Sequence, residues 1–206
     1  MGKDDNFNKL MRPFELLDRN IISASCHMHM YKRINALSNQ IQVVGKDADA
    51  IIAVRAGSIT SALVSLMACL DKHHSNYSDR ASIGGLIHRL NTQEYRDCFA
   101  PYHGSDAAYD QAVRTLEMAF TTCHSTDDFA AAKKLRNNEV AHILVLDDTP
   151  TVTYECLDSV FLDVRNMCDL AFAALGCGRP INKSYEANHH ATADWFIKTY
   201  IKGMQS

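Results

Sequence analysis

The chain has 206 residues, of which 47% are hydrophobic and 22% are charged. This balance is typical of a folded globular protein and excludes a disordered chain, and the length suits one domain with a modest extension. The formal net charge of -3 excludes a strongly basic surface, so any contact with nucleic acid must be local.

The composition predicts helices, because the 206 residues contain only 9 Gly and 4 Pro to mark turns. Pro13 predicts the opening turn of a first helix over roughly 13–39, since apolar residues recur after it at three- and four-residue steps. The most apolar helix is expected over roughly 48–73. Arg55 and several hydroxyl residues interrupt it, so it is expected to be a buried central helix rather than a membrane span.

The later helices carry recognisable end signals. Ser105 and Thr126 are expected N-caps, because a hydroxyl oxygen can accept a hydrogen bond from the first turn of a helix. Gly176 is an expected C-cap, because glycine readily adopts the left-handed conformation that often ends a helix. The expected helices cover about 79–90, 92–100, 105–123, 126–144, 153–175 and 184–202. The chain is therefore predicted to be all-α.

The cysteines and the N-terminal residues indicate the cellular compartment in which the protein is expected. The seven cysteines are scattered without a Cys-x-x-Cys pair, which predicts neither a disulfide framework nor a zinc knuckle. The N-terminal residues contain no apolar signal core. We therefore expect a cytoplasmic protein that does not enter a membrane.

One cation falls where an apolar side chain is expected. At about 100° per residue, the helix over 126–144 has an apolar stripe, and Arg136 lies inside it. An unpaired guanidinium is costly to bury, so a partner or a function must compensate it. By contrast, Arg165 lies off the apolar edge of the next long helix. Alternatively, Asn137 and Asn138 break the helix and shift its phase. The stripe consists of Phe129, Ala132, Val140, Ile143 and Leu144.

His142 follows Arg136 by six residues, hence by about 120° on a regular helix, so the two do not share one straight face. They can converge if the helix is distorted or if two chains pair across a twofold axis, and a homodimer is therefore part of the catalytic hypothesis. RNA cleavage by the ribose 2′-hydroxyl needs a proton acceptor with a near-neutral pKa and a cation for phosphorane charge, which histidine and arginine supply without metal or cofactor. Lys133 and Lys134 are candidate RNA phosphate contacts.

The run Lys134-Leu-Arg-Asn-Asn-Glu-Val-Ala-His142 resembles the Arg-x(4 to 6)-His signature of the HEPN superfamily (higher eukaryotes and prokaryotes nucleotide-binding), including a polar residue after the arginine. The wider similarity is to its abortive-infection U-type branch. That pattern begins with Leu66-Met-Ala-Cys-Leu-Asp71, continues through Ser82-Ile-Gly-Gly-Leu-Ile-His-Arg-Leu90, and covers about residues 10–175.

The resemblance implies an up-and-down helical bundle over 10–176 that dimerises through the motif helices. Residues 177–206 are then an additional C-terminal helical extension packed on the same domain. It also implies a ribonuclease toxin or phage-defence effector restrained by a neutralising, antitoxin-like partner. In such enzymes the arginine, the polar residue and the histidine line a composite cleft, which here means Arg136, Asn137 and His142.

Two functions remain open from the sequence. The first is a homodimeric endoribonuclease that cuts RNA, with DNA not expected as a substrate: His142 is general base or acid, Arg136 stabilises phosphate charge, and Asn137 positions the pair. The second is a non-catalytic nucleotide-binding or dimerisation module in which a carboxylate such as Asp71 or Glu117 holds Arg136. No metal site is expected, since His190 with Asp194 offers only two ligands.

Overall fold

The computed structural model describes residues 3–38, 46–72, 81–141, 154–176 and 183–204, and within these ranges it contains helices and no strand. The prediction of an all-α protein is confirmed. The elements are α1 (Lys3–Ser38), α2 (Lys46–Leu70), α3 (Ile83–Leu90), α4 (Gln93–Phe99), the 3-10 helix η2 (Ala100–His103), α5 (Asp106–His124), α6 (Asp127–Ala141), α7 (Tyr154–Ala174) and α8 (Lys183–Met204).

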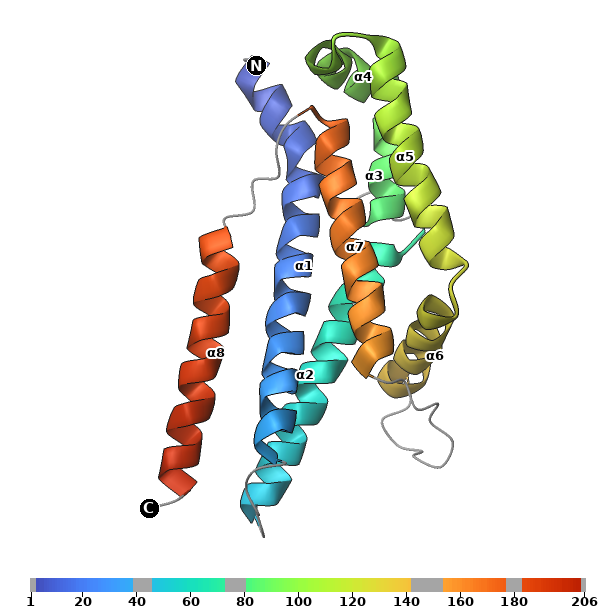
Figure 1. The fold of residues 1–206 in the computed structure, drawn as a ribbon. Coiled ribbons are helices and arrows are strands. Elements are labelled where there is room, and N and C mark those ends of the chain that lie inside the picture. The colour runs from blue at the N-terminus through green and yellow to red at the C-terminus, as the bar shows by residue number, and fades with distance from the viewer. Residues whose placement is uncertain (1–2, 39–45, 73–80, 142–153, 177–182, 205–206) are drawn as a thin grey trace.

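Four long helices form the body of a bundle. Figure 1 shows α1, α2, α5 and α7 running along the long axis, with α1 and α2 antiparallel and side by side. The short helices α3 and α4 lie between α2 and α5 in the chain, and α4 is at one end of the bundle while α6 is at the other. The last helix, α8, packs along the outer side of α1.

The core is built from the apolar stripes of these helices. Phe14, Leu66, Leu86, Tyr109 and Phe172 come from five different helices, and each is fully buried. Such burial contributes roughly 1.5–3 kcal/mol for each large apolar side chain. The buried Tyr109 hydroxyl donates a hydrogen bond to the Leu90 carbonyl oxygen at 2.6 Å, so the polar tip of this ring is also satisfied.

The first helix begins earlier than the sequence predicted. It starts at Lys3, and Pro13 lies inside it rather than at its opening turn. The apolar stripe continues on the N-terminal side of the proline, because Leu10 is buried and the Phe7 ring packs 5.8 Å from the Phe99 ring. This packing outweighs the roughly 3 kcal/mol that a proline costs inside a helix.

The expectation of a buried central helix is correct only for the second half of α2. Leu63 and Leu66 are buried in the core, whereas Ile52 and Val54 are 54% and 40% exposed. By length and composition Asp49–Leu70 could cross a membrane, and 28% of its apolar window is buried in the fold. Sequence hydropathy alone did not distinguish these two halves, because burial depends on which neighbours cover them.

The expected helix caps are confirmed. Ser105 Oγ accepts a hydrogen bond from the Ala108 amide at 3.2 Å, and Thr126 Oγ1 accepts one from the Phe129 amide at 3.2 Å. Gly176 follows α7 with φ +70°, and a Cβ at this position would stand 2.5 Å from Tyr102 Cβ. Glycine is therefore required at 176 by both backbone conformation and space.

Candidate functional site

Helix α6 places Arg136 at the edge of its buried face. Phe129, Ala132 and Leu135 are buried, and the Arg136 side chain is 29% exposed. The sequence identified Phe129 and Ala132 but missed Leu135, and three further residues assigned to the stripe lie outside the described side chains, namely Val140, Ile143 and Leu144. The helix runs unbroken to Ala141, so the hypothesis that the paired asparagines interrupt it is wrong.

Arg136 is held by two side chains of its own chain. Its Nη1 donates to Asp71 Oδ1 at 3.3 Å, while its Nε and Nη2 both donate to Asn137 Oδ1 at 3.2 Å. Of the two carboxylates that the sequence offered as partners, Asp71 is therefore the one that binds Arg136. Glu117 instead accepts a hydrogen bond from Asn91 Nδ2 at 2.7 Å.

Asp71 is placed by the end of α2, which His124 fixes to the neighbouring helices. The Leu70 carbonyl oxygen lies 3.1 Å from His124 Nε2, and the Phe120 carbonyl oxygen lies 2.9 Å from His124 Nδ1. The His124 ring also packs 4.2 Å from the Phe129 ring of α6. His124 thus links α2, α5 and α6 beside the Arg136–Asp71 pair, and the sequence did not reveal this role.

The environment of His124 favours its neutral form. Burial is the largest effect and lowers the pKa of His124. The two backbone carbonyls raise this pKa, and the charges of Lys72 and Lys133 lower it further. A neutral imidazole has one N–H, so at neutral pH it donates to one of the two carbonyls at a time.

The remaining candidate residues are not brought together with Arg136 by the described contacts. His142 lies outside the described residues. Lys133 and Lys134, three and two residues before Arg136, are exposed, and Lys133 Nζ lies 5.9 Å from the centre of the Phe129 ring. The described cluster therefore consists of Arg136, Asn137 and Asp71, and the two lysines are exposed on the same helix.

Arg136 and Arg165 differ less in burial than the helical wheels predicted. Arg165 on α7 is half-buried and engaged with other groups, and Arg136 is half-buried as well. Position on a helical wheel did not separate a solvated arginine from a compensated one, because neighbouring helices decide both burial and pairing.

The described side chains do not indicate a metal-binding site or a reactive cysteine. That part of the chain contains no group of three or more His, Cys, Asp or Glu side chains arranged to hold a metal ion. Burial is the main cause that raises the pKa of Cys123 to about 12 and that of Cys156 to about 11. These thiols are therefore protonated at neutral pH and poor nucleophiles.

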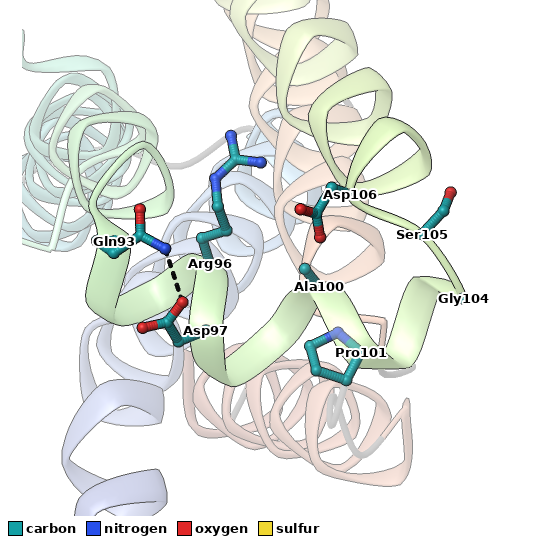
Figure 2. Close-up of a pocket in the computed structure, with 8 residues that line it drawn as sticks. All are labelled: Gln93, Arg96, Asp97, Ala100, Pro101, Gly104, Ser105 and Asp106. Carbon is teal, nitrogen blue, oxygen red and sulfur yellow. Dashed lines mark hydrogen bonds between the residues drawn. The ribbon is translucent and has the colours of Figure 1, made fainter.

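An open pocket of about 360 Å³ lies at the other end of the bundle, between α4 and the start of α5. Figure 2 shows Gln93 and Asp97 on α4, with Asp106 on the α5 side. Asp97 accepts a hydrogen bond from Gln93 at 2.7 Å, and Arg96 pairs with Asp110. Gln93, Asp97 and Arg96 thus already have partners, and the pocket contains none of the candidate catalytic or RNA-contacting residues. The other lining residues are Ala100, Pro101, Gly104 and Ser105.

These features define an all-α helical bundle with a compensated arginine at the junction of α2 and α6. No protein-family model, characterised protein or solved structure matches the chain.

Proposed function

We propose that this protein is a metal-independent, cytoplasmic endoribonuclease of HEPN type that acts as a homodimer, with Arg136, Asn137 and His142 forming a composite site. The observation that carries the proposal is the placement of Arg136 within the motif. Its guanidinium is ordered by Asp71 and Asn137 while 29% of the side chain remains exposed. An ordered cation needs little rearrangement to meet charge that develops on a substrate.

The donor geometry leaves capacity for a phosphate. A guanidinium has five N–H donors, and the contacts to Asp71 and Asn137 use three of them. The other two have no partner among the described residues and are available to phosphate oxygens. Lys133 and Lys134, exposed three and two residues earlier, add positive charge along the same helix.

The proposed reaction is an internal transfer that requires no metal. His142 removes the proton of the ribose 2′-hydroxyl, the 2′ oxygen bonds to phosphorus, and the bond from phosphorus to the 5′ oxygen breaks. Arg136 stabilises the negative charge of the phosphorane, and the departing 5′ oxygen takes up a proton. The products are a 2′,3′-cyclic phosphate and a 5′-hydroxyl end.

The test is incubation of the purified protein with cellular RNA in excess EDTA. Cleavage with 2′,3′-cyclic phosphate ends is expected, with losses of about 100-fold or more in Arg136→Ala and in His142→Ala. Arg165→Ala, which removes a half-buried arginine from α7, is the matched control and should cut normally. The proposal fails if the intact protein and Arg136→Ala leave RNA equally uncut.

A second function, a non-catalytic nucleotide-binding or dimerisation module, is favoured by the ion pair itself. Asp71 neutralises Arg136 within one chain, which is what a structural arginine requires. This module would bind RNA or nucleotide, or form a dimer, without cutting RNA. A dimeric solution mass together with intact RNA and intact ends would favour it over the nuclease.

A further inference from the structure

The described side chains of α8, 187–199, make little apolar contact with the bundle. The helix lies along the outer side of α1 (Figure 1). Among its described side chains, 187–199, only Ala193 and Ile197 are buried. The aromatic side chains Trp195 and Phe196 are 65% and 47% exposed. Within this described part of α8, polar contacts therefore supply much of the attachment to α1.

These polar contacts form one cluster between the two helices. His29 Nε2 lies 3.1 Å from Asp194 Oδ1, and Arg33 Nε donates to the same oxygen at 2.8 Å. His190 Nε2 lies 3.2 Å from Ser25 Oγ. The spacing explains the match, because 25, 29 and 33 on α1 and 190 and 194 on α8 are separated by four residues and share a face of each helix.

Two imidazole rings lie at the centre of this cluster. The His29 and His190 rings are stacked with centroids 4.3 Å apart and an interplanar angle of 6°. Stacked neutral rings attract, whereas two imidazolium rings at this distance repel. We call Ser25, His29, Arg33, His190 and Asp194 the histidine stack.

The charge balance of the histidine stack changes as pH falls. Burial raises the pKa of Asp194, but its hydrogen bond from His29 and the charge of Arg33 outweigh that effect, and the pKa is lowered. Asp194 therefore stays ionised in mild acid. Protonation of both His29 and His190 would place two further positive charges beside Arg33, and these three cations would share this one carboxylate.

The nearby charges on both helices add to the positive side of this balance. Lys198 and His189 are exposed on α8. Lys32 on α1 lies with Nζ 5.8 Å from the centre of the Tyr154 ring of α7. Lys32 and Lys198 are cationic side chains, and His189 is a further histidine beside the histidine stack.

We propose that the histidine stack is an acid-sensitive latch, which docks α8 on α1 at neutral pH and releases it when both stacked rings are protonated. Release would uncover the face of α1 that α8 covers, and would free the exposed aromatic side chains of α8 for other contacts. This inference does not depend on the nuclease proposal.

The experiment is hydrogen–deuterium exchange of the full chain at pH 7.5 and pH 5.5, corrected for the intrinsic exchange rate. At pH 5.5 we expect peptides from 187–199 to lose about tenfold or more in protection, while peptides from α5 keep theirs. In His190→Gln the amide can still bind Ser25 but cannot become charged, so α8 should stay protected at both pH values. His189→Gln removes an adjacent histidine outside the histidine stack and should respond as the unchanged chain does.

The latch is overturned by equal protection of α8 at both pH values, by loss of protection in α5 together with α8, or by an unchanged response in His190→Gln. If His190→Gln already lacks α8 protection at pH 7.5, His29→Gln takes its place, since its amide can donate to Asp194. If that variant also lacks protection at pH 7.5, the two histidines are structural only and the proposal is wrong.

Discussion

The pairing of Arg136 with Asp71 can be measured as a coupling free energy. The two groups are 3.3 Å apart and about 30% exposed, with side-chain values of 29% and 31%. At an effective dielectric near 40 their attraction is about 2–3 kcal/mol, and ordering and screening reduce the net contribution to roughly 0.5–1 kcal/mol. Asp71→Asn, Arg136→Met and the double variant should therefore give a coupling of about that size in urea unfolding followed by helical circular dichroism.

A matched cycle separates this pair from general effects of charge. Asp110 pairs with Arg96 near the opposite end of the bundle from α6, so Asp110→Asn combined with Arg136→Met should be additive. The Asp71–Arg136 coupling should also shrink in 1 M salt. Additive behaviour of Asp71→Asn and Arg136→Met, as in the control cycle, would refute the pairing.

Three further predictions concern stability, and urea unfolding tests each of them. Gly176→Ala should cost about 2 kcal/mol or more, because φ is +70° and the added Cβ meets Tyr102, whereas Gly104→Ala, at φ +74° with no atom near, should cost less. Tyr109→Phe should cost about 1–3 kcal/mol, since the Leu90 carbonyl loses a buried donor; an effect below about 0.5 kcal/mol would contradict this. Because burial lowers the pKa of His124, the unfolded chain protonates first as pH falls below about 6.5, so stability should decrease there, and His124→Gln should reduce that slope. A slope unchanged in His124→Gln would show that other groups cause it.

The sequence predicted helix ends correctly where residues close in the chain determine them. Ser105, Thr126 and Gly176 act through their own turns, and their roles follow from side-chain chemistry and backbone conformation. The start of α1 could not be predicted in this way, because the helix continues through Pro13 to a segment stabilised by packing on Phe99. Likewise, the exposed half of α2 reflects which helices cover it.

The candidate site was likewise predictable only where it depends on local helix geometry. The helical wheel showed that Arg136 needed compensation, and Asp71 was one of two carboxylates considered for it. The wheel could not choose between Asp71 and Glu117, which are 65 and 19 positions away in the chain, because the choice depends on how α2 and α5 end beside α6. His124 and the histidine stack were missed, since their partners are backbone carbonyls or residues far apart in sequence.

The most direct test of the proposed function is a subunit-mixing measurement of RNA cleavage in EDTA. Arg136→Ala and His142→Ala are each inactive in the proposed mechanism, but a mixed dimer contains one site with Arg136 from one chain and His142 from its partner. Mixing the two variants under conditions that exchange subunits should restore cleavage and 2′,3′-cyclic phosphate ends. Cleavage by the unmixed variants, or no recovery in mixtures that demonstrably contain mixed dimers, would contradict a composite site.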